Sequence, residues 1–436
     1  MDRGGAHPTD SAGPEAGLFE RLRPVPTDGN AVLLLQSGAE FFPALVAAID
    51  AASTEVLLET YIFADDEAGL RVAGALAQAA GRGVTVRLLV DGYGTRELPR
   101  GVAERLAAAG VEVRVYAPMP RFLTLDRERL RRLHRKQACI DRRMAFVGGI
   151  NVLDDRWDPN HGALEHPRLD YAVRLVGPVV GTVHASMARL WSQVAFASAP
   201  LREGARGALD GLDRLAGGRP PERLRTPSHD GPRRRHRHAA GTGAGVRAML
   251  VLRDNLANRR AIERAYLKAI GGARREVLIA NAYFFPGRRF RRALREAARR
   301  GVRVRLLLQG RAEYVLPHLA TQALYDPLLA AGVEIVEYHR SFLHAKVAVI
   351  DDWATVGSSN IDPFSLLLAR ESNAVILDAA FAAMLRERLL ASMAEGGRPV
   401  VHDEHARRPW TQRLAGWFAT RMLRLGVLVS GHRQRY

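Results

Sequence analysis

Two parts of the chain repeat the same order of apolar and polar runs. Three short apolar runs recur as matching pairs: 55–58 with 276–279, 83–89 with 301–307, and 110–113 with 332–335. Between these runs lie segments rich in alanine and arginine, with helical character. An alternation of short strands with helices is typical of α/β folds, in which helices cover a sheet. The pattern therefore predicts an α/β protein of two homologous halves, each a β-sheet flanked by helices.

Two of the intervening segments have clear helix boundaries. Residues 67–81 are rich in alanine and leucine, begin after the carboxylates of Asp65 and Asp66, and end at a glycine. Acidic side chains favour the first turn of a helix, and glycine favours its end. Residues 288–300 occupy the same place in the second half and are dense in arginine. Both segments are therefore predicted to be helices.

The segments outside the repeat set the predicted domain boundaries. The first 28 residues mix Gly, Pro, Asp and Glu without an apolar core, and the stretch from 199 to 245 has no sustained period. This second stretch contains the basic tract Arg233, Arg234, Arg235 and Arg237, and its composition is typical of a linker. We expect a disordered N-terminal segment, a first half, a basic linker, a second half and a basic amphipathic tail: 1–28, 29–198, 199–245, 246–400 and 401–436.

The net charge, the cysteine content and the length of the apolar runs restrict the binding partners and the cellular compartment expected for this chain. The 436 residues carry a net charge of +18, which favours polyanions such as nucleic acid or an anionic membrane face. A general arginine bias of the genome is the alternative explanation of this charge. The single cysteine, Cys139, excludes an internal disulfide, suits a reducing compartment and has apolar neighbours, so a buried thiol is expected. Without a secretory signal or a run of about 18 apolar residues, the protein is expected to be cytoplasmic, and soluble or peripheral.

The polar residues carry a repeat of their own. His134, Lys136 and Asp141 form a His-x-Lys-x4-Asp motif, which recurs in the second half as His344, Lys346 and Asp351. Only three of the 64 basic residues are lysines, so a lysine in both motifs suggests a task that arginine performs badly. A compact ammonium is a point charge with rotatable donors, whereas guanidinium is a wide planar fork. Residues two apart in a strand point to one face, so each histidine and lysine can reach one small anion such as phosphate.

Each motif leads into a glycine turn that ends on asparagine. The two turns are Gly148-Gly149-Ile150-Asn151 and Gly357-Ser358-Ser359-Asn360. Small residues let the backbone approach a ligand, and the amides of Asn151 and Asn360 can donate to an oxyanion. Two histidines, two lysines and two asparagines that converge on one point would bind phosphate without a metal ion or a cofactor.

The paired motif, its place within an internal repeat and the following Gly-x-x-Asn resemble the phospholipase D superfamily, whose signature is the paired HKD motif. The resemblance extends over residues 30–400 and is strongest to the short bacterial cardiolipin synthases that lack N-terminal transmembrane helices. Five segments carry the finer likeness: 91–94, 132–136, 146–151, 170–173 and 353–360. The resemblance implies two similar α/β halves about a pseudo-twofold axis, with one shared active site at their junction.

The resemblance also implies a two-step transfer through a phosphohistidine. One histidine attacks phosphorus, while the other protonates the departing alcohol and then deprotonates the incoming one. Related enzymes more often attack with the first motif, which favours His134 as nucleophile and His344 as acid and base. The lysines, Asn151, Asn360 and Ser358 would bind the phosphate oxygens and stabilise the transition state.

The remaining implied site residues are carboxylates. Asp141 and Asp351 belong to the signature and are expected to fix the geometry of their motifs. Asp170 and Glu371 are expected to orient the histidines, with an ordinary surface or ion-pair role as the alternative.

Two departures from the family pattern affect these expectations. Gly149 stands where serine is common, so Ser358 is expected to bind phosphate alone. The spacing from Asp351 to Gly357 is one residue shorter than that from Asp141 to Gly148, which leaves Asp352 as an alternative structural acid.

Two segments suggest contact with a membrane surface. Residues 117–133 mix apolar and arginine side chains, and could enter a headgroup layer or pack on their own half. In the tail, apolar residues recur at helical intervals beside arginines: Leu414, Trp417, Phe418, Met422 and Leu425, with Arg413, Arg421 and Arg424. A basic amphipathic helix with Trp and Phe suits a membrane interface, and docking on the second half is the alternative.

The expected function is therefore transfer of a phosphatidyl group to phosphatidylglycerol by a peripheral enzyme on the cytoplasmic side of the bacterial inner membrane. Its partners would be anionic phospholipids, phosphatidylglycerol and cardiolipin. A phosphodiesterase acting on nucleic acid is the alternative, because a basic protein also neutralises a nucleic-acid backbone. Aromatic and basic residues do not interleave as base stacking requires, which disfavours nucleic acid. A non-catalytic scaffold is disfavoured because both halves keep every chemical residue.

Overall fold

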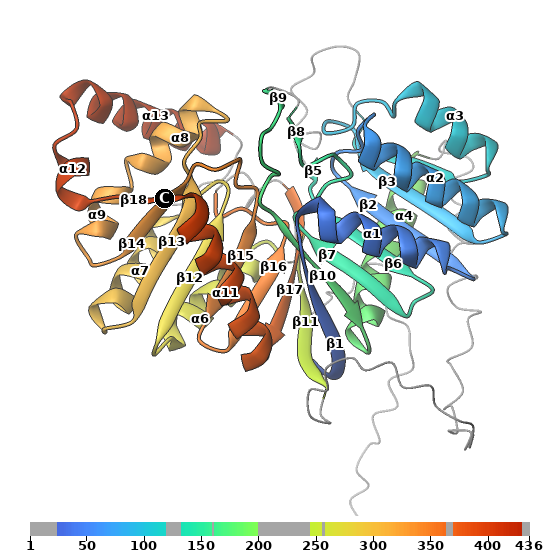
Figure 1. The fold of residues 1–436 in the computed structure, drawn as a ribbon, viewed down its shortest axis with the longest axis horizontal. Coiled ribbons are helices and arrows are strands. Elements are labelled where there is room, and N and C mark those ends of the chain that lie inside the picture. The colour runs from blue at the N-terminus through green and yellow to red at the C-terminus, as the bar shows by residue number, and fades with distance from the viewer. Residues whose placement is uncertain are drawn as a thin grey trace, which may run out of the picture.

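A computed structural model describes residues 24–118, 132–158, 161–198, 245–254, 258–362 and 369–429. One continuous sheet runs through both halves (Figure 1). At its centre, β1 (Thr27–Gln36) pairs antiparallel with β11 (Val246–Arg253). From this pair outward the strand order is β10-β7-β6-β2-β3-β4 in the first half and β17-β16-β15-β12-β13-β14 in the second. The matching orders confirm two equivalent α/β halves, and their separate sheets join into one.

The elements of the first half follow in chain order. They are α1 (Ser37–Asp50), β2 (Glu55–Thr60), α2 (Glu67–Gly81), β3 (Thr85–Asp91), α3 (Arg100–Ala108), β4 (Glu112–Tyr116), β5 (Arg132–Leu133), β6 (Lys136–Ile140), β7 (Met144–Gly148), β8 (Trp157–Asp158), β9 (Gly162–Ala163), β10 (Tyr171–Val176) and α4 (Val179–Ser198).

The second half begins with β11 and repeats this order with additions. Its elements are α6 (Ala261–Gly272), β12 (Glu276–Asn281), α7 (Arg288–Arg299), β13 (Arg303–Gln309), α8 (Val315–Gln322), α9 (Tyr325–Leu329), β14 (Glu334–Tyr338), β15 (Lys346–Ile350), β16 (Trp353–Gly357), β17 (Ala369–Leu377), α11 (Ala379–Gly396), β18 (Gly397–Pro399), α12 (His402–Ala406) and α13 (Trp410–Val429).

Three buried clusters hold the layers together. The first spans both halves and contains Val183 and Met187 of α4 with Leu385 and Leu389 of α11. The opposite face of the sheet packs against α1 and α2 in the first half and against α6 and α7 in the second. Cys139 belongs to the shared cluster and is 1% exposed, which confirms the expected buried thiol. A core common to both halves fixes their relative position.

The direction of the strands decides where the motifs lie. In each half three strands are parallel, β2-β3-β4 and β12-β13-β14, and the motif strand runs antiparallel beside the first of them. The start of β6 or β15 therefore lies at the carboxyl ends of the parallel strands, where α/β sheets commonly bind ligands. Both motif histidines immediately precede these starts.

The predicted helices agree closely with the structure. The helix predicted over 67–81 is α2, and Asp66 caps it by accepting from the Gly69 N–H at 2.9 Å. The helix predicted over 288–300 is α7, which ends one residue earlier. Short polar caps and apolar spacing are local signals, so the sequence alone carries them.

The predicted boundaries are only partly covered by the described residues. Strand β1 begins at Thr27, inside the segment 1–28 predicted to be disordered, because Thr27 pairs with Ala248 of the distant β11. The linker up to residue 244, with its basic tract, and residues 119–131 of the insertion lie outside the described residues. Within the described ranges, every helix is too short or too polar to cross a bilayer.

Candidate active site

The two motif histidines are each anchored to the backbone of the opposite half. The His134 N–H donates to the Arg370 carbonyl at 3.0 Å, and the His344 N–H donates to the Leu169 carbonyl at 2.8 Å. Strand β5, just before His134, pairs in parallel with the start of β17, and Leu343 forms the equivalent bridge with Leu169. These crossed pairings bring both motifs to the seam between the halves.

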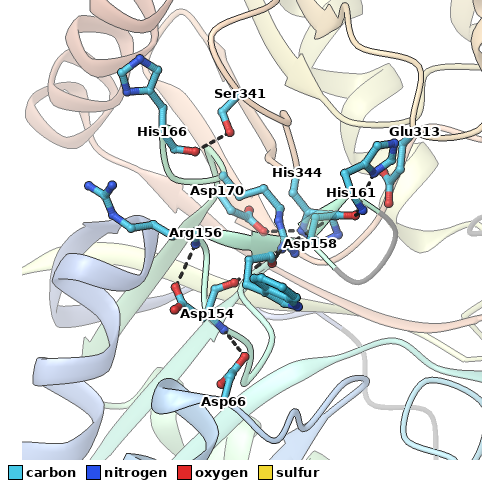
Figure 2. A network of polar contacts seen from close by, with 12 residues as sticks. Asp66, Asp154, Arg156, Asp158, His161, His166, Asp170, Glu313, Ser341 and His344 are labelled. Carbon is cyan, nitrogen blue, oxygen red and sulfur yellow. Dashed lines mark hydrogen bonds and ion pairs between the residues drawn. The ribbon is translucent and has the colours of Figure 1, made fainter. Parts of the chain in front are cut away.

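The side chains follow the same crossed pattern. Nδ1 of His134 lies 3.0 and 3.1 Å from the two carboxylate oxygens of Glu371, and Nδ1 of His344 lies 2.6 Å from Oδ2 of Asp170 (Figure 2 shows the second pair). A carboxylate at Nδ1 holds the proton there and leaves Nε2 with its lone pair. Each histidine is thus paired with an acid that belongs to the other half.

The two motif lysines are buried beside the histidines. Nζ of Lys136 donates to the His134 carbonyl at 2.8 Å, and Nζ of Lys346 donates to the His344 carbonyl. Burial lowers the pKa of Lys136 to about 7 and that of Lys346 to about 8, although Glu371 and Asp170 raise them in part. Two ammonium groups held in a common buried site favour an anionic ligand, because its charge would restore their protonation.

Burial also decides the charge of the histidines and one acid. Burial, reinforced by both lysines, lowers the pKa of His344 well below its ordinary value. Burial lowers the pKa of His134 as well, with Glu371 opposing the change. Burial raises the pKa of Asp170 to about 6. At neutral pH both imidazoles are therefore neutral, the form that a nucleophile and a general base require.

The residues directly after β7 and β16 contact the two acids. A side chain on Gly149 would place its Cβ 2.3 to 2.8 Å from the Asp170 carboxyl group, so the absence of a side chain admits that acid. In the second half, the Ser358 hydroxyl donates to Oε2 of Glu371 at 2.5 Å and is fully buried. Small residues were expected to let the backbone approach a ligand, whereas here they make room for, or hold, the carboxylates. The Ser358 hydroxyl is engaged with Glu371 rather than presented to a phosphate.

The two asparagines are buried next to the motifs. The Asn151 side-chain oxygen accepts from the Ile62 N–H at 3.2 Å, which fixes the side chain and directs its NH2 group elsewhere. Asn360 is 5% exposed, in the equivalent place. Their amides remain candidates for phosphate oxygens.

The motif aspartates lie at the far ends of the motif strands, away from the histidines. Asp141 accepts from the backbone N–H groups of Ser53, Thr54 and Glu55 at 2.8 to 2.9 Å. Asp351 accepts from those of Arg274, Arg275 and Glu276 at 2.9 to 3.0 Å. The oxygens of both acids are used by the loops before β2 and β12, which agrees with the structural role expected for them.

The alternative structural acid has a different partner. Asp352 pairs with the Arg275 guanidinium at 2.6 Å on the surface, whereas Asp351 takes the place equivalent to Asp141. Asp141 and Asp351 also share a left-handed backbone, with φ of 51° and 50°. The one-residue difference in spacing therefore lies after the aspartate and leaves its role unchanged.

Two further residues support the histidines and were not identified as site residues from the sequence. Asp91, at the end of β3, accepts from the Leu133 N–H at 2.7 Å, and Gln309, at the end of β13, accepts from the Leu343 N–H at 3.1 Å. Each thereby fixes the residue before a motif histidine. Their shared position before a glycine at the end of the second strand of each repeat was a usable signal.

The segment between β7 and β10 completes the seam. It runs from the first half onto the second, where the Ser341 hydroxyl donates to the His166 carbonyl at 2.7 Å (Figure 2). Arg168 in this segment lies 3.8 Å from Asp158, and its charge acts on His344 and Lys346. Within the described ranges, no group of three or more His, Cys, Asp or Glu side chains is arranged to bind a metal ion.

Comparison with known proteins agrees with this architecture. The family model described as "Cardiolipin synthase, PLD-like domain" matches residues 45–164 and 266–392, one segment in each half. The chain is 40% identical to cardiolipin synthase B of Salmonella typhi over 384 residues, which cover 88% of this chain and 85% of the relative. It is 39% identical to cardiolipin synthase B of Escherichia coli K12 over 387 residues, with the same coverage.

A solved structure shows the same fold. The phosphatidylserine synthase of Haemophilus influenzae superposes with a TM-score of 0.63 at 12% identity, over 92% of this chain and 94% of that one. The family match spans both halves and includes both histidine motifs. The chain therefore belongs to the cardiolipin synthase family of proteins with phospholipase D-like domains.

Proposed function

We propose that the chain is a phosphatidyltransferase that makes cardiolipin, by moving the phosphatidyl group of one phospholipid to a hydroxyl of phosphatidylglycerol. The observation that carries this proposal is the crossed arrangement of two neutral histidines, each backed by an acid of the opposite half. Its relatives named cardiolipin synthase B support the substrate class. The donor is phosphatidylglycerol or another phospholipid.

In the first step, Nε2 of His134 attacks the phosphorus of the donor lipid. A bond forms between phosphorus and nitrogen, and the bond from phosphorus to the headgroup oxygen breaks. Nε2 of His344 takes up a proton when the charge of the bound phosphate raises its pKa, and it gives this proton to that oxygen as the alcohol leaves. Glu371 stabilises the cation that develops on His134, because its carboxylate accepts a hydrogen bond from the Nδ1–H group.

In the second step, the acceptor alcohol attacks the phosphohistidine. His344 takes the hydroxyl proton, the new phosphorus–oxygen bond forms, and the bond to His134 breaks. Lys136, Lys346 and the amides of Asn151 and Asn360 are placed to stabilise the nonbridging oxygens in both transition states. Ser358 is then a positioning residue that acts through Glu371, to which it donates.

The order of the histidines has a direct test. Rapid acid quench with radiolabelled phospholipid is expected to leave label on the His344→Ala protein and none on His134→Ala, because only His134 forms the covalent bond. The opposite labelling pattern would exchange the two roles.

We also propose peripheral association with an anionic membrane, through α13. One face of α13 packs on α8 through Ala419 and Leu423. Its other face exposes large apolar side chains, 72% for Trp410, 54% for Trp417 and 56% for Phe418. The helix therefore docks on the second half, the alternative expected for it, and its exposed apolar face supports the proposed membrane contact.

Arginines border this surface. Arg421 lies over the Trp417 ring at 5.0 Å, and Arg424 has Arg288 and Arg421 as charged neighbours. Apolar and aromatic side chains flanked by cations suit the interface of an anionic bilayer. The cytoplasmic face of the bacterial inner membrane is the expected location.

Sedimentation with phosphatidylglycerol vesicles tests this surface in the full chain. Trp417→Ser together with Phe418→Ser is expected to lower the bound fraction severalfold. The matched control is Phe196→Ser, since Phe196 is 57% exposed on α4. Equal binding by both variants would contradict the proposed surface.

The alternative substrate is nucleic acid, which the net charge of +18 also suits. Purified protein is incubated with labelled phosphatidylglycerol or with plasmid, each with and without EDTA. Thin-layer chromatography is expected to show cardiolipin in both lipid reactions and an intact plasmid. Plasmid cleavage with inert lipid would overturn the proposal, and loss of activity in EDTA would contradict a metal-free mechanism.

A further inference from the structure

The second half contains a pocket that the mechanism above does not use. It lies between the ends of β12 and β13 and the start of α8, has a cavity volume of about 20 Å³ and is partly open to solvent. A cavity needs about 10–15 Å³ to hold one water molecule, so this one has room for a single hydroxyl group. Its polar lining includes Tyr283, Gln309, Glu313 and Tyr314.

The pocket offers both an acceptor and a donor of hydrogen bonds. Glu313 lines it and accepts from the Tyr283 hydroxyl, which leaves further lone pairs on the carboxylate. Gln309 is 8% exposed, and its Nε2 makes no hydrogen bond with any described residue. Its oxygen is identified by the bond from the Leu343 N–H, so the NH2 group is the part without a partner. A hydroxyl group can donate to Glu313 and accept from Gln309.

The same residues connect the pocket to one histidine. Gln309 holds Leu343, the residue directly before His344, and the charge of Lys346 acts on Glu313. Figure 2 draws Glu313 and His344 in the same network, with Asp170 behind the imidazole. The pocket is therefore linked to His344 through Gln309 and Leu343, and its acid lies within electrostatic reach of Lys346.

A carboxylate is a poor neighbour for a phosphate but a good one for an alcohol. Glu313 would repel the charged part of a phospholipid and accept from a neutral hydroxyl. The first half has no equivalent, because Thr95 stands at the matching place and donates to the Tyr61 carbonyl. At this place in the repeat, the second half therefore has a carboxylate where the first half has a threonine.

We propose that this pocket binds one hydroxyl of the acceptor's polyol headgroup, held by Glu313 and Gln309, while a neighbouring hydroxyl is presented to His344. This inference rests on the proposed function, and it assigns the binding of the acceptor alcohol to the second half. In the transfer step the presented hydroxyl gives its proton to Nε2 of His344 and its oxygen bonds to phosphorus, as the bond from phosphorus to His134 breaks. The hydroxyl held by Glu313 keeps its proton and distinguishes a polyol from a simple alcohol.

Competition between two alcohols tests the pocket. The full-length protein receives phosphatidylglycerol in mixed micelles with labelled glycerol and labelled 1-propanol, and the two labelled lipids are separated and counted. Both alcohols react with the same covalent intermediate, so their ratio does not depend on how fast the donor is cleaved. We expect the wild-type protein to favour glycerol, and Glu313→Gln to lower the ratio of glycerol to 1-propanol about tenfold, as loss of a hydrogen bond to a charged group predicts.

The chain supplies a matched control and a milder variant. Glu337 also accepts from a tyrosine hydroxyl, that of Tyr325 at 3.1 Å, but does not line the pocket, so Glu337→Gln is expected to keep the wild-type ratio. Tyr283→Phe removes only the hydroxyl that holds Glu313 and is expected to lower the ratio in the same direction.

The outcomes separate the inference from the proposed function. A wild-type ratio in both Glu313→Gln and Tyr283→Phe would overturn the inference, as would a wild-type protein with no preference for glycerol. A wild-type protein that only hydrolyses phosphatidylglycerol, and attaches neither alcohol, would instead refute the proposed transferase function.

Discussion

The two halves share a scaffold but differ in the residues that serve the histidines. In the first half the residue after the motif glycine is Gly149, and the space of its missing side chain is filled by the short acid Asp170. In the second half the same place holds Ser358, whose hydroxyl donates to the longer acid Glu371. The acid and the residue beneath it change together. The two halves thus keep the same contact between acid and imidazole although they use different pairs of residues for it.

Each acid lies in its own half with the residue beneath it, but serves the histidine of the other half. Asp170 holds His344, and Glu371 holds His134. Neither half therefore contains a working histidine and its acid together. We therefore expect that substitution of an acid in one half impairs the histidine of the other half.

The largest expected effect comes from the acids themselves. Asp170→Asn and Glu371→Gln are each expected to lower kcat by about 10³-fold or more, since an amide can donate to Nδ1 and stabilise the wrong tautomer. Lipid transfer by purified variants measures the loss. Asp352→Asn, on the surface beside Arg275, is the control. If one acid proves dispensable, the crossed pairing matters for only one histidine.

Substitution of the residue that contacts each acid is expected to lower kcat more at Gly149 than at Ser358. Gly149→Ser is expected to lower kcat about 100-fold, because its Cβ would displace the Asp170 carboxylate and a misplacement of about 1 Å has costs of that order. Ser358→Ala removes one hydrogen bond to Glu371 and is expected to lower kcat about tenfold.

Gly181→Ser is the control for the glycine change, since nothing lies within 4 Å of a Cβ built there. Steady-state kinetics on the three variants gives the order. Equal losses in Gly149→Ser and Ser358→Ala would contradict the exchange of parts between the halves.

The two halves also differ in how strongly their motif aspartates are expected to stabilise the fold. Asp141 accepts from three backbone N–H groups and the hydroxyls of Ser53 and Thr54, whereas Asp351 accepts from three backbone N–H groups and lacks the hydroxyl donors. We expect Asp141→Asn to lower the free energy of unfolding by about 2 kcal/mol and Asp351→Asn by less. Asparagine tolerates the left-handed backbone of both positions, so only charge and acceptors change.

Urea unfolding at neutral and acidic pH measures these losses. Burial opposes ionisation of both aspartates, but their backbone donors outweigh it and lower each pKa. The stability they contribute is therefore present above the pKa of the unfolded state and is lost as pH falls through the folded-state pKa. The difference between wild type and Asp141→Asn should shrink on acidification, and a constant difference would argue against the charge.

The smallest expected effect is the number of protons that the site takes up when phosphate binds. At pH 8 Lys136, with a pKa of about 7, is mostly neutral, and Lys346, with a pKa of about 8, is half charged. Binding of inorganic phosphate should raise both values and take up protons, on the order of one per site. Calorimetric titration in two buffers of different ionisation enthalpy measures the uptake. Heats that do not depend on the buffer would contradict the lowered pKa values.

Local signals in the sequence predicted much of the fold. The helix over 67–81 matches the structure, and each motif lysine lies in a strand as expected, because capping and alternation act over a few residues. The repeat itself predicted the two equivalent halves. Joining of their sheets through β1 and β11 was not predicted, because this pairing depends on residues about 220 positions apart.

The sequence predicted many of the site residues but not which of them contact one another. Both acids were named, yet which histidine each serves depends on contacts 237 and 174 positions apart. Ser358 was expected to bind phosphate because it follows the motif glycine, and only the fold places Glu371 within its reach. Glu313 had no signal in the repeat, since its counterpart is Thr95.

The distance along the chain between His134 and its carboxylate has a consequence for biosynthesis. Glu371 is translated 237 residues after the imidazole that it activates. The proposed nucleophile of a growing polypeptide therefore lacks its acid until nearly all of the chain has emerged from the ribosome. Prematurely terminated products would be inert toward the lipids around them.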